Sequence, residues 1–255
     1  MIELYENERL DEVNDKLRLI QKTDGLTFGT DALLLAGYVR ESYRLGCELG
    51  GGSGIISLLL LSRTKLDRTD CVEVQKEYAE LIGRNAELNS LLGRLSPIHS
   101  DIRELPPVAK YDIVYTNPPY MKADSGYSNA KSKKNVARHE VLGTIYDFCK
   151  VASKILKFGG KFVAVYRPDR ICDLIASMRA WRLEPKRMTF VHARADSEPS
   201  MLLVEARLGG GVGAIITKPL IIYADGENYS SDMNYIMENG SFPAEFYTQA
   251  KAKGK

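Results

Sequence analysis

The sequence predicts an α/β protein built on a doubly wound, mostly parallel sheet with an antiparallel hairpin at its edge. Short apolar runs rich in β-branched residues alternate with stretches of helical length along most of the chain, which is the pattern of successive βαβ units. A glycine cluster at 50–54 separates a strand from a helix, as at a ligand-binding turn. Two late apolar runs are joined by only a short polar link, which favours an antiparallel pair.

The first half of the chain is expected to contain five strands and three helices. Thr30 is placed to cap a helix through DALLLAGYV, and a second helix is expected from Ser53 to about Arg63. QKEYAELIGRNAELN (75–89) has the length and pattern of a third helix. The strands are predicted at LRLIQK (17–22), the segment ending in CEL (47–49), TDCVEV (69–74), RLSPIH (94–99) and the strongly apolar YDIVYT (111–116).

The second half begins with a long loop, from Asn117 to about Val141, and loops of this length are usually functional or disordered. A helix over Thr144–Leu156 is expected to stop at Gly159-Gly160. Pro168 opens another helix that runs to about Ala180. Strands are predicted at KFVAVY (161–166), MTFVHA (188–193) and SMLLVEAR (200–207), the last two forming the hairpin.

The glycine-rich GGGVG (209–213) divides the chain into a domain of residues 1–208 and a C-terminal appendage of residues 209–255, whose last dozen residues we expect to be disordered. No apolar run is long enough to span a bilayer, and the acidic N-terminus lacks the features of a secretion signal, so we expect a cytoplasmic protein without a membrane partner. The four cysteines form no CxxC pair and have no histidine at ligand spacing, so no metal site is expected.

Basic residues concentrate in one part of the chain, although the formal net charge is only +2. Residues 131–194 contain 15 Lys/Arg against 5 Asp/Glu, a balance of +10, so the rest of the chain carries −8. This asymmetry favours a polyanionic partner, which we take to be RNA, although a set of solvated helix faces would give the same count. The candidate phosphate contacts are Lys131, Lys133, Lys134, Arg138, Arg167 and Arg170.

The glycine cluster follows Glu48 with the spacing G-x-G-x-G at Gly50, Gly52 and Gly54. Glycines allow a tight turn and a close approach of backbone to ligand at the positive end of a helix. The spacing differs from the G-x-G-x-x-G of dinucleotide folds, and the Glu48 carboxylate would repel a pyrophosphate. It would favour a cationic amino-acid group instead, such as the ammonium of S-adenosylmethionine.

Two further carboxylates follow the next two strands. Glu73, with Val74 beside it, lies where a carboxylate can accept hydrogen bonds from both ribose hydroxyls, although a solvated strand end is the alternative. Asp101 is placed to accept a hydrogen bond from the adenine amine of a cofactor, with Ile102 packing on the ring. A helix N-cap or turn residue is the alternative for Asp101.

Asn117-Pro118-Pro119-Tyr120 follows directly on the strand YDIVYT, whose carboxyl end should open at the ligand crevice. Two prolines fix the backbone and leave the Pro118 carbonyl without a competing amide, and the Asn117 side chain offers a second acceptor. Two acceptors that face one point suit an exocyclic NH₂, and Tyr120 offers a ring for base stacking. The alternative is a loop whose prolines merely end a strand.

This arrangement suits methylation of a nitrogen conjugated to an sp² carbon. The lone pair of such an amine is delocalised into the ring, and acceptors on its hydrogens favour the pyramidal geometry that frees it. Fixed dipoles aimed at developing charge are typically worth a few kcal/mol, and alignment of the two reactants supplies much of the rest. The reaction needs neither a metal nor a strong base.

Glu-Leu-Gly-Gly-Gly-Ser-Gly followed by Asn-Pro-Pro-Tyr resembles the seven-stranded S-adenosylmethionine-dependent amino-methyltransferases, which implies a class I methyltransferase-like Rossmann fold. FGTDALLLA (28–36) and NVARHE (135–140) narrow the resemblance to the bacterial valine-tRNA adenine-N6 methyltransferases, over roughly residues 17–207. Gly51 stands where many relatives carry Thr or another residue, a difference that should change little. The resemblance implies tRNA as partner, catalysis by residues 117–120 and cofactor contacts from Phe28, Gly29, Thr30, Asp31, Glu48, Gly50, Gly52, Glu73, Asp101 and Asn117.

Other functions remain open on the same fold. Asn-Pro-Pro-Tyr also serves methylation of a glutamine amide in peptide release factors, usually with an N-terminal helical domain, and methylation of guanine N2 in ribosomal RNA. A non-catalytic RNA-binding relative would keep the fold without the chemistry. His139 suits either gating and RNA contact or a loop-anchoring hydrogen bond, and Trp181 fits packing better than base stacking. The oligomeric state is not indicated.

Overall fold

The computed structural model describes residues 3–24, 28–119 and 143–247, and its centre is a large, mostly parallel sheet. The strands lie side by side in the order β10-β8-β9-β7-β6-β3-β4-β5, and β11 also pairs with β8. Within the seven-stranded part, only β9 runs antiparallel, to both β7 and β8. Its strands are β3 (Tyr43–Leu49), β4 (Leu66–Glu73), β5 (Leu95–His99), β6 (Tyr111–Thr116), β7 (Leu156–Tyr166), β8 (Leu183–His192) and β9 (Pro199–Leu208).

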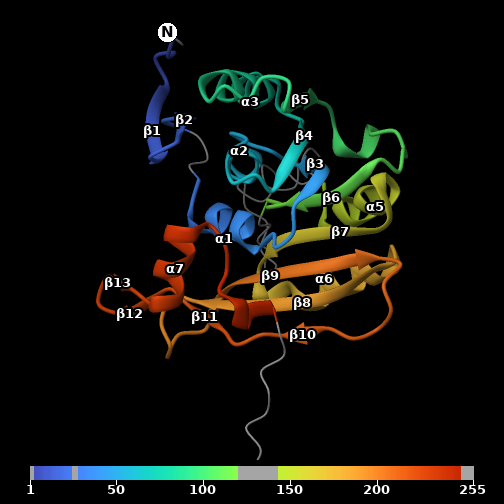
Figure 1. The fold of residues 1–255 in the computed structure, drawn as a ribbon. Coiled ribbons are helices and arrows are strands. Elements are labelled where there is room, and N and C mark those ends of the chain that lie inside the picture. The colour runs from blue at the N-terminus through green and yellow to red at the C-terminus, as the bar shows by residue number, and fades with distance from the viewer. Residues whose placement is uncertain (1–2, 25–27, 120–142, 248–255) are drawn as a thin grey trace, which may run out of the picture.

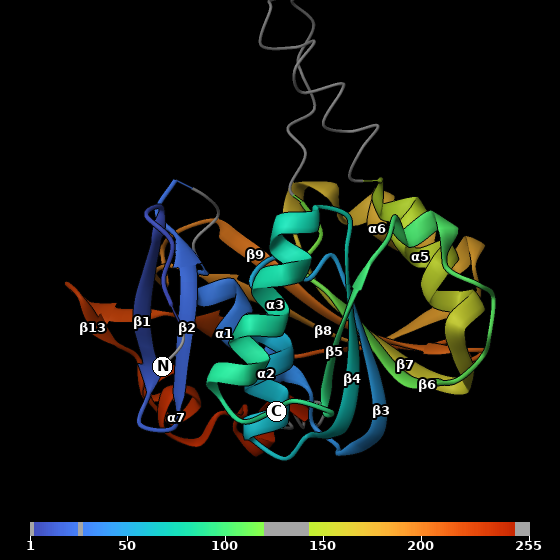
Figure 2. The ribbon, with the colours of Figure 1, turned by 90° about the horizontal axis from the view of Figure 1, so that it is seen from above.

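Helices cover both faces of this sheet, as Figure 2 shows from above. α1 (Thr30–Tyr38), α2 (Ile55–Ser62) and α3 (Lys76–Leu88) lie on one face, and α5 (Ile145–Ile155) and α6 (Ile171–Ala180) lie on the other. Buried side chains form one apolar cluster on each face. The doubly wound, mostly parallel fold class with an antiparallel hairpin is therefore confirmed.

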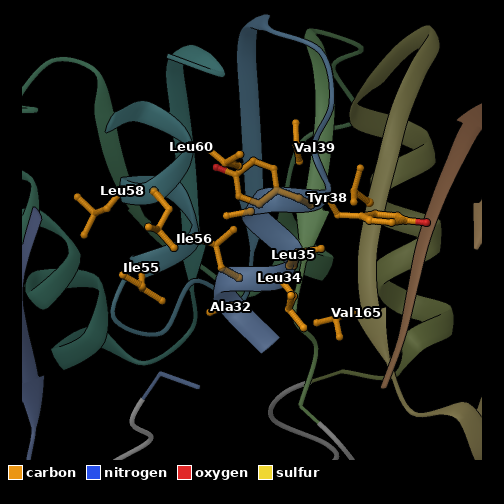
Figure 3. Close-up of a cluster of buried hydrophobic side chains, with 14 of the residues drawn as sticks. Ala32, Leu34, Leu35, Tyr38, Val39, Ile55, Ile56, Leu58, Leu60 and Val165 are labelled. Atoms are coloured by element: carbon orange, nitrogen blue, oxygen red, sulfur yellow. The ribbon is translucent and has the colours of Figure 1, made fainter. Parts of the chain in front are cut away.

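The sequence of α1 and α2 explains the first of these clusters. α2 carries the run IISLLLLS, in which every residue from Ile55 to Leu61 is buried, so this helix is enclosed on all sides. Figure 3 shows Leu34, Leu35 and Tyr38 of α1 beside the side chains of α2, with Val165 of β7 below them. The two helices are thereby fixed against the sheet next to the loops that carry the site.

β7 and β8 begin earlier than expected, at Leu156 and Leu183 and not at Lys161 and Met188, whereas α5 ends within one residue of the prediction. β7 begins directly after α5, so the helix ends before Gly159-Gly160 and these glycines lie inside the strand. A Cβ at Gly160 would lie 2.8 Å from the Lys157 carbonyl oxygen, which explains why glycine is needed where the β6–β7 register shifts. α5 itself begins with a capping box, in which Thr144 and Asp147 satisfy each other's backbone amides.

A small hairpin precedes the main sheet. β2 (Leu17–Lys22) confirms the first predicted strand, and β1 (Glu8–Asn14), which was not predicted, pairs with it antiparallel. The hairpin lies beside α3 (Figure 1), where Arg84 binds Glu8 with N–O separation of 2.6 Å. Asn85 accepts a hydrogen bond from the Ile20 amide at 2.7 Å, so the hairpin is tied to the domain.

The C-terminal segment continues the main sheet and packs on the same core. β10 (Ile215–Ile216) and β11 (Leu220–Ile221) run parallel to β8, and α7 (Ser231–Asn239) lies against α1. β12 (Tyr223–Asp225) and β13 (Asn228–Tyr229) form a second small hairpin (Figure 1), and three short 3-10 turns lie at Ile102–Glu104, Pro168–Arg170 and Ala244–Tyr247. The boundary between residues 208 and 209 stays a prediction, and the last eight residues lie outside the described ranges.

Candidate functional site

The predicted site residues follow neighbouring parallel strands at one edge of the sheet. β5, β4, β3 and β6 are adjacent, and Asp101, Glu73, the glycine loop and Asn117 come at or just after their carboxyl ends. The Thr116 hydroxyl donates to the Leu49 carbonyl at 2.7 Å, which joins the end of β6 to the start of the glycine loop. The fold thus brings these four features together, as expected of a topological switch point.

The glycine loop, residues 50–54, is shaped by backbone angles that side chains disfavour. Gly50, Gly52 and Gly54 all have positive φ, at 74°, 54° and 81°. A Cβ at Gly52 would meet nothing within 4 Å, so the chain leaves open space on that side of the loop. The three spaced glycines are therefore required by conformation, and the middle one borders open space and donates its amide to Glu73.

Gly51 is required for a different reason, which is the lack of space for a side chain at this position. A Cβ at this position would lie 2.2 Å from the Cys71 sulfur and 3.1 Å from Cδ1 of Ile82. The loop crosses so closely over β4 that the Cys71 thiol occupies the space of a side chain at position 51. A larger residue at 51 therefore requires either movement of the loop or the Cys71 thiol, or a smaller residue at 71.

Glu48 is buried at the end of β3, with 1% of its surface exposed. Its Oε2 accepts hydrogen bonds from the Ser57 amide, the Ser57 hydroxyl and the Cys71 thiol, while Oε1 is buried without a partner among the described residues. Desolvation by burial raises the pKa of Glu48 to about 7. A buried carboxylate oxygen with no donor is costly unless a ligand supplies one.

Ser57 and Tyr115 extend this network and were not predicted. The Ser57 hydroxyl lies 2.7 Å from the Tyr115 hydroxyl, which lies 2.8 Å from Oγ1 of Thr69. The one sequence signal was Ser57 itself, a polar residue inside the apolar run of α2. Because the network fixes Oε2 of Glu48, it also fixes the direction of the free oxygen.

Glu73 and Asp101 are both held by backbone amides. Glu73 accepts from Gly52 N–H through Oε2 and from Gln75 N–H through Oε1, each at 2.9 Å, and it is buried rather than a solvated strand end. Asp101 caps the turn Ile102–Glu104 by accepting from Arg103 N–H at 2.8 Å, so the N-cap alternative is observed. The Arg103 guanidinium beside it lowers the pKa of Asp101.

The Asn117 amide is oriented by a contact from the far end of the site. Its Nδ2 donates to Oδ2 of Asp31, in the first turn of α1, at 2.7 Å. Its Oδ1 is buried and has no hydrogen-bond partner in the part of the chain that the structure describes. The backbone before Asp31 is held as well, because Phe28 N–H donates to the buried Gln21 side chain at 2.8 Å.

The remaining predicted residues that the structure describes make contacts of their own. Arg167 and Arg170 follow β7, and each binds an acidic neighbour on its own turn, Asp169 and Asp173. Trp181 packs edge-on to Tyr146 with ring centroids 5.6 Å apart and belongs to the second apolar cluster, in accord with packing. Outside the described residues lie Tyr120, Lys131, Lys133, Lys134, Arg138 and His139.

Residues 3–24, 28–119 and 143–247 contain no group of three or more His, Cys, Asp and Glu arranged to hold a metal ion. Among the helices in those ranges, none has the length and apolarity to cross a membrane.

Comparison with known proteins identifies the family of the chain. A family model described as methyltransferase small domain matches residues 22–173, which include the glycine loop, Glu73, Asp101 and Asn117. A tRNA1(Val) (adenine(37)-N6)-methyltransferase of Aeromonas hydrophila is 30% identical over 205 residues, which cover 79% of this chain and 84% of that protein. One of the same name from Dyadobacter fermentans is 27% identical over 199 residues, covering 76% of this chain and 81% of that protein.

Solved structures show the same fold. The crystal structure of a predicted O-methyltransferase from Agrobacterium tumefaciens aligns with a TM-score of 0.68 and 22% identity, covering 84% of this chain and 98% of that one. The chain belongs to the methyltransferase small domain family and to the family of the tRNA1(Val) (adenine(37)-N6)-methyltransferases named above, and it is an S-adenosylmethionine-dependent methyltransferase.

Proposed function

We propose that this protein methylates an exocyclic amine, most specifically N6 of an adenine in tRNA. The observation that carries the proposal is the Oδ1 atom of Asn117, a buried acceptor without a partner among the described residues, directly after β6 and beside the glycine loop. The printed names of the relatives from Aeromonas hydrophila and Dyadobacter fermentans support the same substrate. An unpaired acceptor at this point suits a ligand that brings N–H donors.

The cofactor would lie along the carboxyl ends of β3, β4 and β5. The free oxygen of Glu48 suits its ammonium group, and the open space beside Gly52 suits a close approach to the backbone. Each oxygen of Glu73 accepts one amide, which leaves a lone pair on each for the ribose hydroxyls. Asp101 and Ile102 would flank the adenine, and Phe28, Gly29, Thr30 and Val74 would complete the contacts.

When bound, S-adenosylmethionine supplies an electrophilic methyl on a sulfonium, so transfer forms an N–C bond, breaks a C–S bond with its electron pair on sulfur, and releases one amine proton. Asn117 would accept one amine hydrogen, and the carbonyl of Pro118 would accept the other. Pro119 has a fixed φ and so restrains the backbone that follows that carbonyl. Both acceptors stabilise the positive charge that develops on the nitrogen, and Tyr120 would stack on the base.

The RNA would be held by basic residues near this edge. Arg167 and Arg170 follow the carboxyl end of β7, next to β6, and a phosphate would have to compete with Asp169 and Asp173 for them. Exposed ion pairs of this kind contribute little to stability, so a phosphate could displace the two aspartates from these arginines. Lys131, Lys133, Lys134 and Arg138 belong to the same proposal. We also propose a cytoplasmic location, where tRNA is modified, and the division into residues 1–208 and 209–255.

Transfer of a labelled methyl group to bulk tRNA by the purified protein tests the proposal. Asn117→Ala removes the unpaired acceptor and should lower kcat by roughly 100-fold or more. Asn228→Ala is the matched control, because Asn228 also donates to a carboxylate, that of Asp225, but on the hairpin β12–β13. Its rate should equal that of the wild type.

Parallel reactions with ribosomal RNA and with protein separate the alternatives. Methyl transfer to tRNA that yields N6-methyladenosine supports the proposal. Transfer only to a guanine of ribosomal RNA or to a protein glutamine would show that the substrate is a different one, although the reaction is still methylation of an amine. Binding of tRNA without transfer to any of the three would leave a non-catalytic RNA-binding protein and end the proposal.

A further inference from the structure

We propose that Asp31 is a positioning residue that locks the Asn117 amide in one orientation and so makes the pocket select a nitrogen that carries hydrogens; this inference rests on the proposed function. Asp31 and Asn117 lie 86 residues apart in the sequence. In the fold, Oδ2 of Asp31 accepts from Nδ2 of Asn117 at 2.7 Å. Sequence reasoning assigned Asp31 to the cofactor, which is a different role.

An asparagine side chain has two ends of similar shape and opposite polarity. A carboxylate only accepts hydrogen bonds, so the end of Asn117 that faces Asp31 must be the NH₂ group. Turning the amide over would bring two oxygen acceptors to hydrogen-bond distance and would put the NH₂ group where the unpartnered Oδ1 now lies. The charge on Asp31 therefore decides that Asn117 presents Oδ1 to the substrate.

Asp31 is itself fixed by its surroundings. Its Oδ1 accepts from Ala32 N–H at 2.9 Å, and it lies in the first turn of α1, where the helix favours negative charge. Gly29 leaves room for this rotamer, because a Cβ there would lie 2.9 Å from Oδ1 of Asp31. The Asp31 carboxylate is thus held in place and does not move with the Asn117 amide if that amide turns over.

The orientation has a consequence for specificity. Oδ1 of Asn117, buried and unpaired within the described residues, offers a favourable contact only to a donor such as an exocyclic NH₂. A ring nitrogen with a lone pair, or a carbonyl oxygen, would be repelled by Oδ1 because both atoms are hydrogen-bond acceptors. Without Asp31 the amide could turn and would lose this preference, while the glycine loop that faces the cofactor would be unchanged.

Asp31→Ala measures the effect. A hydrogen bond to a charged group is worth enough that kcat should fall by about 10- to 100-fold, while KM for tRNA and Kd for S-adenosylmethionine stay within about 3-fold of the wild type. Asp31→Asn keeps an acceptor and should lose less. Asp225→Ala is the matched control, because Asp225 holds Asn228 at 2.9 Å in the same manner and should leave all three constants unchanged.

A double-mutant cycle then asks whether Asp31 acts through Asn117. In single-turnover reactions, Asp31→Ala should cost nothing further once Asn117→Ala is present. As a readout independent of catalysis, the side-chain NH₂ signal of Asn117 in protein labelled with ¹⁵N-asparagine, assigned by its absence in Asn117→Ala, should move in Asp31→Ala and stay in place in Asp225→Ala.

The outcomes separate this inference from the function beneath it. Three results would each overturn the positioning role while the wild-type enzyme remains active. The first is that the rate losses of the two single variants multiply in the double variant. The others are a tenfold weaker Kd for the cofactor in Asp31→Ala and an unmoved Asn117 signal. A wild-type protein that transfers no methyl group at all would overturn the proposed function, and the specificity role of Asp31 with it.

Discussion

Gly51 lies where the glycine loop crosses β4, and a methyl group has no space there. Its Cβ would be 2.2 Å from the Cys71 sulfur, whereas unstrained contacts between heavy atoms are about 3.5–4.0 Å, so the loop or the thiol must move by roughly 1.5 Å. Overpacking of this kind costs about 1–3 kcal/mol. For a chain of this size, Gly51→Ala should lower Tm by roughly 2–12 °C.

Removing the thiol should rescue the variant. In Cys71→Ala the nearest atom of residue 71 to the new methyl is Cβ, at 3.8 Å, and Ile82 at 3.1 Å must yield by only a few tenths of an ångström. Cys71→Ala alone costs stability because it empties buried space. The double variant should nevertheless be more stable than Gly51→Ala, which is a coupling that independent sites do not show.

Thermal unfolding without cofactor and calorimetric affinity for S-adenosylmethionine are the two assays. The affinity should fall in Gly51→Ala and recover in the double variant, because the neighbouring Gly52 carries the loop amide that donates to Glu73. Gly211→Ala is the matched control, since a Cβ there meets nothing within 4 Å. The steric argument would be refuted if Gly51→Ala kept the Tm and the cofactor affinity of the wild type. It would also be refuted if adding Cys71→Ala restored neither quantity.

Two other predictions concern buried charges. The pKa of Glu48 is raised to about 7 from an ordinary 4.5, so its proton stabilises the folded, cofactor-free protein fully below about pH 4.5, and this contribution is lost as pH rises through about 7. The Tm of Glu48→Gln should therefore rise relative to that of the wild type as the pH increases from about 4.5 to about 7. A difference in Tm that does not change with pH would contradict the burial argument. Arg187 is nearly buried, with Nη2 bound to the Tyr38 carbonyl at 2.7 Å and to Glu205 at 2.9 Å. Arg187→Met should lose about 3–5 kcal/mol in urea unfolding, and a loss below about 1 kcal/mol would show that Lys161 alone suffices for Glu205.

The sheet was predictable because its strands are apolar, regularly spaced and separated by helices of normal length. β1 was missed because ERLDEVN is mostly polar, and its pairing with β2 exposes most of it. β10 and β11 have two residues each, too few to show any periodicity. The start of β7 was placed at Lys161 and not at Leu156, because Gly159-Gly160, a usual helix stop, lies inside the strand here.

Within the site, the motifs gave positions but not contacts. The glycine loop and Asn117 were recognisable from local spacing alone. The bond between Asp31 and Asn117 depends on how α1 packs against the end of β6, which no local pattern encodes. The Ser57–Tyr115–Thr69 chain likewise depends on which side chains of α2, β6 and β4 face one another. For the same reason, Asp101 could not be distinguished in advance from a capping residue.

The central claim is that a fixed oxygen of Asn117 presents an exocyclic amine of tRNA for methylation. Mass analysis of the modified nucleosides in tRNA from cells with and without this protein tests that claim most directly, with Asn117→Ala restored to the deficient cells in a third sample. N6-methyladenosine should disappear without the protein and should not return with the variant. An unchanged N6-methyladenosine level, or loss of a methylated guanosine instead, would contradict it.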